Sequence, residues 1–216
     1  MPSSTRPQLP KNWPPHLPYL IQPTYSPSLL SSTLATLRTP PPNAQILASQ
    51  QQGPAGPSPL VRIRPISDPA HPANGQHGLF AARDLPPGSF ILLYGGHVHG
   101  AEDADPGSDY DLSLDAEAGV GIDAGRGGNE ARFVNDYRGI EAGGPNAEFR
   151  EVWVRKGKVV EKGMGVFVLG AGKSGRRARG IGRGSEVLVS YGKGFWRLRG
   201  MGEEEGRSEE EGGKAA

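Results

Sequence analysis

The sequence predicts a β-dominated fold preceded by a disordered, proline-rich arm. Three observations lead to this prediction. From Leu60 onward, short apolar runs rich in Val, Ile, Leu and aromatic residues recur between glycine and proline turns. No convincing ten-residue amphipathic helix occurs among these runs. Finally, 14 of the 21 prolines lie within residues 1–59.

The arm, residues 1–59, contains stretches such as "TPPPNAQ" and "QQGPAGPSP". Proline has no backbone N–H and its ring obstructs a helix, so these stretches can neither hold a helix nor complete a β-ladder. We therefore expect this region to be mostly disordered. Only "LLSSTLATL" (29–37) has the pattern of a short helix, one that can form on a partner.

Residues 60–198 are predicted to form one domain of several small β-sheets with few short helices. "DLPPGS" (84–89) is a proline-then-glycine turn between two of its strands. A disordered tail rich in glycine and glutamate, 199–216, is expected to follow. The predicted strands are "LVRIRPI" (60–66), "GLFAA" (78–82), "SFILLY" (89–94), "YDLSL" (110–114), "AEFREVWV" (147–154), "MGVFVL" (164–169) and "EVLVSY" (186–191).

A basic, glycine-rich insertion, "GAGKSGRRARGIGRG" (170–184), interrupts the strand pattern. It carries five Lys or Arg residues without interleaved aromatic residues, so a solvated surface loop is favoured over a nucleic-acid contact. Its "GAGKSG" lacks the spacing of a Walker phosphate-binding loop. We therefore expect no specific nucleic-acid partner.

Composition excludes several classes of function. The chain has no cysteine, which rules out disulfide frameworks, thiolate zinc sites and cysteine nucleophiles. The formal net charge of +1 gives no global attraction to nucleic acid or membranes. No run of about 18 apolar residues is present, so no membrane-spanning helix is expected. We also expect no signal peptide and a nuclear or cytoplasmic location. No metal site is predicted, because the histidines His97 and His99 have no carboxylate partner at a suitable spacing.

Single residues suggest little function on their own. Asn135 fits an ordinary turn or cap, and Tyr191 fits a half-buried strand tyrosine. Three longer motifs are more informative because of their order along the chain. They are "GQHGLFAARDLPPGSFILLYGG" (75–96), then "GVGIDAGRGGNEARFVND" (119–136) with the preceding "YDLSL" (110–114) and the later Pro145-Asn146, and finally "GSEVLVSYG" (184–192) with the preceding "MGVFVL" (164–169).

In this order the motifs resemble those of the SET domain, the fold of a large family of protein-lysine methyltransferases, from Gly75 to Trp196. The resemblance implies small β-sheets whose C-terminal segment threads under a loop as a pseudoknot. It implies S-adenosylmethionine as methyl donor and a lysine of a histone or another protein as acceptor. The expected function is therefore S-adenosylmethionine-dependent protein-lysine N-methylation.

The chemistry explains the residue types that the resemblance points to. A free lysine has a pKa of about 10.4, and its ammonium has no lone pair with which to attack a methyl group. A narrow apolar channel and a positive sulfonium both lower that pKa, so no strong general base is required. The resemblance implies Tyr191 as the catalytic hydroxyl, with Tyr94, Tyr110 and Phe195 lining the lysine channel.

The resemblance also implies a set of cofactor-binding residues. Glycine lets the main chain approach a ligand closely, so the turn before the first strand would bind through its backbone. Asn135 would offer its side-chain amide to the methionine part of the cofactor. The full implied set is Gln76, His77, Gly78, Arg132, Asn135, Asp136 and Trp196.

The chain departs from the family pattern at three places. Gln76 replaces the first glycine of a Gly-x-Gly turn, with Gly75 one position earlier. Asp136 stands where the family has histidine, and its carboxylate is expected either to help binding or to pair with Arg132 or Arg138. The cysteine-rich zinc cluster of many relatives is absent.

Two other functions fit the same sequence. A catalytically inactive SET-like module would engage a partner through its basic loop or its proline-rich arm. A β-rich, nucleic-acid-associated protein would bind through Arg176, Arg177 and Arg179 in a salt-dependent way. We expect the active enzyme, with a protein or peptide lysine as its partner and with no membrane partner.

Overall fold

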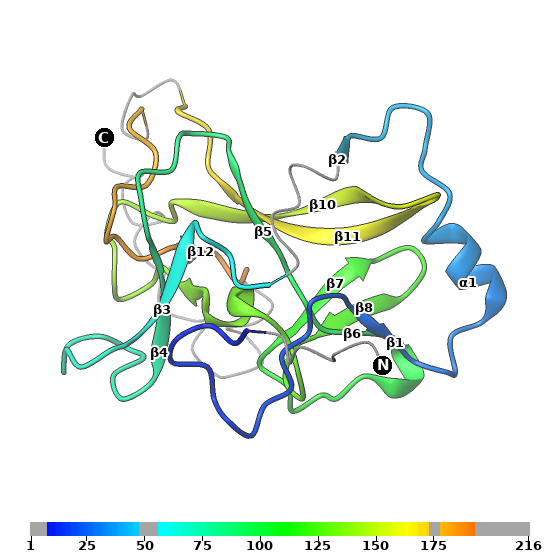
Figure 1. The fold of residues 1–216 in the computed structure, drawn as a ribbon, viewed down its shortest axis with the longest axis horizontal. Coiled ribbons are helices and arrows are strands. Elements are labelled where there is room, and N and C mark those ends of the chain that lie inside the picture. Colours follow the sequence, from blue (N-terminus) through cyan, green and yellow to red (C-terminus); the bar gives the residue numbers. More distant parts are fainter. Residues whose placement is uncertain (1–7, 48–55, 173–177, 193–216) are drawn as a thin grey trace, which may run out of the picture.

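The fold was analysed in a computed structural model, which describes residues 8–47, 56–172 and 178–192. Within these ranges the chain is β-dominated, with several small sheets and one α-helix of six residues (Figure 1). The predicted fold class is thereby confirmed. The predicted tail at 199–216 and the two predicted site residues Phe195 and Trp196 lie outside the described residues.

A long antiparallel hairpin forms the largest feature of the fold. Strands β10 (Ala147–Lys156) and β11 (Val159–Val168) pair along their full length, from Ala147 opposite Val168 to Lys156 opposite Val159. Gly157 in the connecting turn has a φ of 61°, a value that favours glycine. Strands β2 (Ile46–Leu47) and β5 (Phe90–Leu93) flank the hairpin and complete a sheet of order β2-β10-β11-β5.

A second four-stranded sheet has the order β1-β6-β8-β7 and lies below the hairpin in Figure 1. Its strands are β1 (Thr24–Tyr25), β6 (His97–Gly100), β7 (Asp111–Asp115) and β8 (Val120–Asp123). The short 3-10 helix η2 (Ala101–Asp103) follows β6.

Two smaller sheets carry the segments that the sequence motifs single out. Strand β3 (Val61–Pro65) pairs antiparallel with β4 (His77–Ala81), and β9 (Asn135–Asp136) pairs parallel with β12 (Leu188–Val189). The 3-10 helix η3 (Glu130–Phe133) leads directly into β9. These elements position the candidate site.

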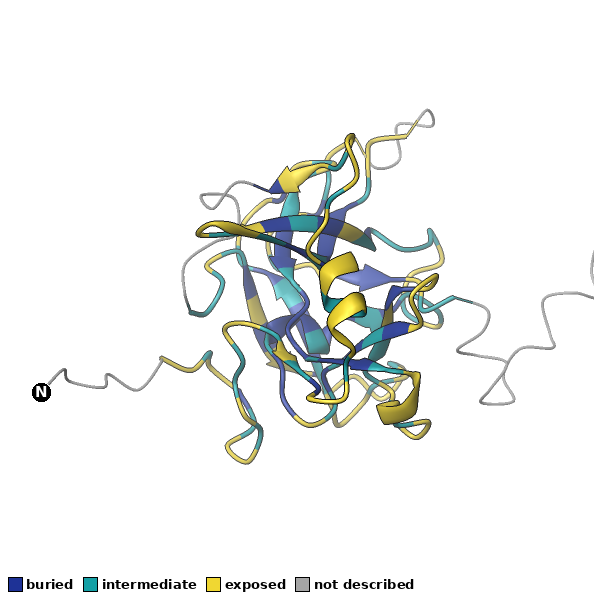
Figure 2. Cartoon of the chain, turned by 90° about the vertical axis from the view of Figure 1, so that its right-hand side faces the viewer, coloured by how far each residue is buried: buried dark blue, intermediate teal, exposed yellow. Residues whose placement is uncertain are grey.

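One large hydrophobic core joins all four sheets of the described residues (Figure 2). Leu79, Leu114, Val166 and Val187 have at most 1% exposure and come from β4, β7, β11 and the approach to β12. The predicted strands supply much of this core, and in β3 and β8 buried residues alternate with more exposed ones. In β3, for example, Val61 and Ile63 are buried whereas the intervening Arg62 is exposed.

The predicted disorder of residues 1–59 is wrong for residues 8–47. Trp13 is 7% exposed and packs edge-on against Phe133, with ring centroids 5.7 Å apart. Farther along, β1 pairs with β6 and β2 pairs with β10. The prolines of these residues lie outside the helix and the strands, while apolar residues between them pack on the domain. Only two-residue stretches take part in each strand pairing. The arm is therefore part of the folded domain.

The short helix expected within 29–37 is present as α1 (Ser31–Thr36). None of its residues is buried, and it lies on the surface of the domain (Figure 2). Leu37, which follows it, is 2% exposed and belongs to the main core. The helix thus forms within this chain, without requiring a partner.

The segment around Leu188 and Val189 contacts both ends of the loop 135–146. Leu188 and Val189 pair with Asn135 and Asp136, whereas the backbone N–H of Asn146 donates to the carbonyl of Leu188 at 3.0 Å. Residues 135–146 thus contact this segment with both of their ends. This arrangement agrees with the expected pseudoknot.

The basic insertion does not remain a surface loop over its whole expected length. Ile181 is 2% exposed, and its backbone exchanges hydrogen bonds of 2.9 and 2.8 Å with Leu85. The C-terminal end of 170–184 is therefore built into the domain. No helix in the described ranges has the length and apolar character that a membrane span requires.

Candidate active site

Three of the tyrosines that the sequence singles out line one pocket. Tyr94, Tyr110 and Tyr191 surround a cavity of about 310 Å³, together with Arg132 and Phe149. Tyr94 follows β5, Tyr110 precedes β7, and Tyr191 follows β12. The fold thus brings together residues that lie up to 97 positions apart in the sequence. We call this cavity the tyrosine pocket.

Tyr191 is fixed at both its backbone and its hydroxyl. The hydroxyl donates a hydrogen bond of 2.6 Å to the carbonyl of Val134, and the backbone N–H donates to Asp136 Oδ2 at 2.7 Å. Burial, followed by the negative charge of Asp136, raises the pKa of Tyr191 above its ordinary value. Tyr191 therefore stays a neutral phenol and is not suited to act as a base.

Tyr94 forms a rigid wall of the pocket. It is 4% exposed, its hydroxyl donates to the carbonyl of Tyr110 at 2.7 Å, and its ring packs edge-on against Phe149 at 5.7 Å. Burial raises its pKa well above the ordinary value, and the nearby Tyr191 adds to this effect. Tyr94 thus contributes a neutral phenol to the wall, which Asp109, Asp111 and Arg132 also line.

Arg132 lies in the tyrosine pocket. Its guanidinium stands 4.1 Å from the centroid of the Tyr110 ring, and its Nε donates to the carbonyl of Ala124 at 3.1 Å. Its hydrogen bond and ring contacts are with Ala124, Tyr110 and Phe133, and none of them is with Gln76, His77 or Gly78. Its predicted role in cofactor binding stays a prediction.

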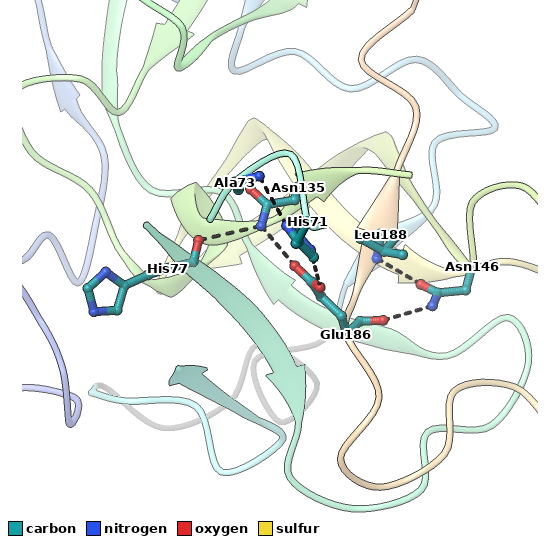
Figure 3. A network of polar contacts seen from close by, with 7 residues as sticks. All are labelled: His71, Ala73, His77, Asn135, Asn146, Glu186 and Leu188. Carbon is teal, nitrogen blue, oxygen red and sulfur yellow. Dashed lines mark hydrogen bonds and ion pairs between the residues drawn. The ribbon is translucent and has the colours of Figure 1, made fainter. Parts of the chain in front are cut away.

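A polar network surrounds Asn135 (Figure 3). Its Nδ2 donates to Glu186 Oε1 at 2.8 Å and to the carbonyl of His77 at 3.4 Å. Glu186 Oε2 is 3.1 Å from His71 Nε2. We call His71, Asn135 and Glu186, with the backbone of His77, the Asn135 network.

The glycine turn before β4 borders this network. Gly75 has a φ of 83°, so the left-handed position falls on this glycine, one place before Gln76. Gln76 itself is exposed. A Cβ at Gly78 would lie 2.4 Å from Glu186 Oε1, so only glycine leaves room for that carboxylate. The structure therefore brings His77 and Gly78 to Asn135, as the resemblance implies.

Asp136 points away from the network. It is 6% exposed, and its carboxylate accepts from Arg138 Nη1 at 3.0 Å as well as from the backbone of Tyr191. Of the alternatives left open by the sequence, pairing with Arg138 is the one observed. The carboxylate ties the strand that carries Asn135 to the segment that carries Tyr191.

The tyrosine pocket and the Asn135 network meet along a single segment. Val134, whose carbonyl accepts the Tyr191 hydroxyl, immediately precedes Asn135. Phe133, just before it, packs against both Trp13 and the ring of His77, with centroids 5.7 and 6.0 Å apart. In three consecutive residues, Phe133 packs against aromatic rings, the carbonyl of Val134 accepts from the Tyr191 hydroxyl, and Asn135 carries the amide of the network.

Sequence reasoning missed Glu186 and His71 as site residues. The side chain of Glu186 is 8% exposed and that of His71 is 10% exposed. A glutamate within the apolar run "EVLVSY" is the signal that could have found Glu186, because a buried carboxylate needs partners. Nothing comparable marks His71. Within the described ranges, no group of three or more His, Asp or Glu side chains is arranged to hold a metal ion.

Comparisons with known proteins found similarity only to solved structures. No protein-family model matches the sequence, and no curated protein does. A crystal structure of the polycomb repressive complex 2 from Chaetomium thermophilum aligns with 64% of this chain at 20% identity and a TM-score of 0.46. The same complex in an autoinhibited conformation bound to S-adenosylmethionine gives the same values. A third structure, bound to GSK126, aligns with 68% of this chain at 22% identity and a TM-score of 0.46. The aligned regions span only 16% or 17% of those chains.

Proposed function

We propose that this chain is an S-adenosylmethionine-dependent protein-lysine N-methyltransferase with a SET-type fold. The observation that carries the proposal is the meeting of the tyrosine pocket with the Asn135 network. Three tyrosines from separate strands line one cavity, and the carbonyl that holds Tyr191 is adjacent to Asn135. The ordered motifs that resemble the SET family account for these residues together.

The residues of the Asn135 network fit the proposed cofactor. S-adenosylmethionine, when bound, supplies an electrophilic methyl group on a positively charged sulfur. The carboxylate of Glu186 and the amide oxygen of Asn135 offer negative charge and an acceptor for a cationic ligand. Gly78 lets the backbone come close at the same place. We propose that Gln76, His77, Gly78 and Asn135 hold the cofactor, the first three through their backbone.

The tyrosine pocket suits the side chain of a lysine. Aromatic walls from Tyr94, Tyr110 and Phe149 can enclose the aliphatic stem and exclude water. The aromatic walls, the sulfonium of the cofactor and Arg132 favour the neutral amine that can attack, whereas Asp109 and Asp111, which line the same pocket, act in the opposite direction. No general base is then needed within the pocket. A water path would take the proton that the amine loses.

Tyr191 is proposed to orient the reacting groups. Its hydroxyl is a neutral oxygen dipole that is fixed on Val134, with lone pairs available to a methyl group that carries partial positive charge. Alignment in a closed pocket, with no proton transfer by Tyr191, is the contribution assigned to it. We further propose that the acceptor is a lysine of a histone or another protein in the nucleus or cytoplasm.

Cofactor binding tests the proposal directly. Calorimetric titration of the full chain with S-adenosylmethionine should give saturable heat, and the cofactor should raise the thermal unfolding midpoint. Asn135→Ala should weaken both effects, whereas Asn74→Ala, an exposed asparagine of the loop before β4, should change neither. Absence of heat together with an unchanged midpoint for the unaltered chain would contradict the proposal.

A further inference from the structure

Exposed arginines stand on the solvent side of the β3–β4 sheet. In β3, Val61 and Ile63 are buried in the core, whereas Arg62 and Arg64 are exposed. Because alternate residues of a strand share one face, both arginines point away from the core. Phe80 of β4 lies opposite Arg62 and is half-buried, and the guanidinium of Arg64 is 5.3 Å from the centroid of its ring. The ring thus supports one of the two arginines.

The end of the basic insertion brings further arginines to the same region. Residues 179–184 run beside the turn that follows β4, where the backbone N–H of Arg183 donates to Asp84 Oδ1 at 2.7 Å. Gly180 has a φ of 67°, and a Cβ at this position would overlap the carbonyl oxygen of Leu85, so only glycine allows the approach. The insertion is therefore docked at a fixed place. The exposed arginines of this region, which we call the arginine patch, are Arg62, Arg64, Arg83, Arg179 and Arg183.

The positive charge of the arginine patch is not compensated by ion pairs. Among the described residues, no arginine of the patch pairs with a carboxylate, whereas four arginines elsewhere in the fold do: Arg38, Arg126, Arg138 and Arg150. Arg62 donates to backbone carbonyls, which leave its charge in place. Of the acidic residues beside the patch, Asp84 accepts the backbone of Arg183, and Glu186 is occupied by Asn135 and His71.

The chemistry of the patch selects a partner with several phosphates. Arginine keeps its charge at all physiological pH values and binds phosphate through two parallel N–H donors. All five charged groups of the patch are arginines, and they come from one strand and two loops, so a single small anion cannot meet them all. The sequence adds Lys173, Arg176 and Arg177 shortly before Arg179, at positions that lie outside the described residues. A nucleic-acid backbone offers a row of phosphates that can contact such a patch.

We infer that the arginine patch binds the phosphate backbone of a nucleic-acid duplex without regard to base sequence. Phosphate contacts position a protein but carry no sequence information, so this partner differs from the specific one that the sequence argues against. The insertion alone favoured a solvated loop, and only the fold joins its end to the arginines of β3. This inference goes beyond the proposed methyl transfer and does not depend on it.

Fluorescence polarisation of the full chain with a labelled DNA duplex of about 20 base pairs tests the inference. Each neutralised phosphate contributes about −0.9 to the slope of log affinity against log salt concentration, so five contacts predict a slope of about −4.5. Affinity should therefore fall about 20-fold between about 50 and about 100 mM salt. A duplex of unrelated sequence should bind equally, and an RNA duplex shows which nucleic acid is preferred. Absence of salt-dependent binding to either duplex would overturn the inference.

The combined variant Arg62→Gln, Arg64→Gln, Arg183→Gln places the contact on the patch. Three lost contacts should reduce the slope to about −1.8, so that affinity falls only about threefold over the same salt range. All three side chains are exposed, and circular dichroism checks the fold. If the combined variant does not fold, Arg183→Gln alone decides, because it should lower the magnitude of the slope by about one.

The matched control removes the same formal charge from exposed positions outside the patch, by Lys11→Gln, Arg126→Gln and Lys158→Gln together. It should keep the slope of the unaltered chain. An equal loss of slope in the control would show that net charge alone attracts the duplex, and it would overturn the inference.

Two other occupants of the patch give different results. If anionic lipid were the partner, vesicles of phosphatidylserine would bind the chain and the duplexes would not. The chain also carries six glutamates of its own within 203–211. If they covered the patch, duplex binding would be absent from the unaltered chain and would emerge when all six are replaced by glutamine. Either result would overturn the inference.

Discussion

Asp136 is the residue at which this chain departs most clearly from the motif it resembles. Its carboxylate accepts from the backbone of Tyr191 at 2.7 Å and from Arg138 at 3.0 Å, and its side chain is 4% exposed. The aspartate at this position therefore has a structural role, because it holds Tyr191, the proposed catalytic residue, against β9.

Replacing Asp136 by asparagine should destabilise the chain. The NH2 group of the asparagine would face a donor, either the Tyr191 N–H or the Arg138 guanidinium, whichever way the amide is turned. We expect the free energy of unfolding to fall by about 1–3 kcal/mol, measured by urea denaturation. Asp105→Asn removes an Asp–Arg pair in which Asp105 is 43% and Arg126 is 89% exposed, so its effect should stay within about 1 kcal/mol. Equal effects of the two variants would contradict this account.

Gly78 gives a steric test of the same region. In Gly78→Ala the new Cβ would lie 2.4 Å from Glu186 Oε1 and 3.0 Å from the Phe80 ring, so the carboxylate must shift from its observed position beside Asn135. We expect S-adenosylmethionine binding, measured by calorimetry, to weaken about tenfold or more. Gly170→Ala, whose Cβ would meet nothing within 4 Å, is the control and should bind normally. Normal binding by Gly78→Ala would show that the position of Glu186 does not matter.

At the scale of elements, Glu161 joins the arm to the β10–β11 hairpin. It accepts hydrogen bonds from Tyr25 at 3.2 Å, from Arg38 at 3.1 Å and from Lys156 at 3.0 Å, and it is 8% exposed. Burial tends to raise its pKa, but the hydrogen bonds and charges of Lys156 and Arg38 outweigh burial and hold the pKa below 4.5. The arm is therefore attached through an ionised carboxylate.

This attachment makes stability depend on pH in a definite direction. Because the pKa is lower in the folded than in the unfolded chain, Glu161 stabilises the fold above its ordinary pKa of 4.5, and this contribution is lost as the pH falls through the folded value. Urea denaturation between pH 7 and pH 3 should show a shallower loss of stability in Glu161→Gln than in the unaltered chain. Glu141→Gln, an exposed control, should leave the pH dependence unchanged. Parallel curves for Glu161→Gln and the unaltered chain would argue against the predicted role.

The elements differ in how well the sequence predicts them. The run at 60–66 is observed as β3, because alternating buried and exposed residues signal a strand locally. Strand β11 begins at Val159, five residues before the predicted run, since pairing with β10 draws Glu161 and Lys162 into the ladder. The run at 186–191 shortens to Leu188–Val189, because two flanking backbone groups have side-chain partners: the Asn146 amide donates to the carbonyl of Glu186, and Asp136 accepts from the N–H of Tyr191. The residues at which β11 and β12 begin and end therefore depend on contacts with distant parts of the chain, which the local sequence does not reveal.

At the scale of the whole molecule, the arm wraps the domain and reaches the site from outside. Tyr19 donates to the buried carboxylate of Glu130 at 2.9 Å, and Glu130 opens the helix η3 that leads to Asn135. Trp13 packs on Phe133 in the same helix. Proline content suggested disorder, but proline restricts backbone conformation without preventing packing. The arm therefore supports the site-bearing segment.

Removing the Trp13 side chain should destabilise the whole domain. Trp13→Ala leaves a cavity against Tyr19 and Phe133, so the free energy of unfolding should fall by about 3–5 kcal/mol in chemical denaturation. Leu9→Ala, which truncates an arm residue that is 51% exposed, should change it by less than about 0.5 kcal/mol. A small effect of Trp13→Ala would mean that the arm is dispensable for folding.

The candidate site was predictable only in part. Ordered motifs singled out Tyr94, Tyr110, Tyr191 and Asn135, and the fold places the tyrosines around one cavity with Asn135 beside it. Glu186 and His71 escaped notice because their contacts join positions 51 and 115 apart, and no local pattern encodes such a pairing. Motifs thus identified the residues at the reacting centre, while the residues that orient them emerged only from the fold.

The most direct test of the central claim is methyl transfer from labelled S-adenosylmethionine to an array of lysine-containing peptides. The account predicts label on lysine with the unaltered chain and a loss of about 100-fold in rate with Tyr191→Phe, which still binds the cofactor. Tyr137→Phe, which removes a hydroxyl near the same segment, should keep its activity. Transfer by Tyr191→Phe at the rate of the unaltered chain would contradict the assigned role, and cofactor binding without label on any lysine would contradict the claim of methyl transfer.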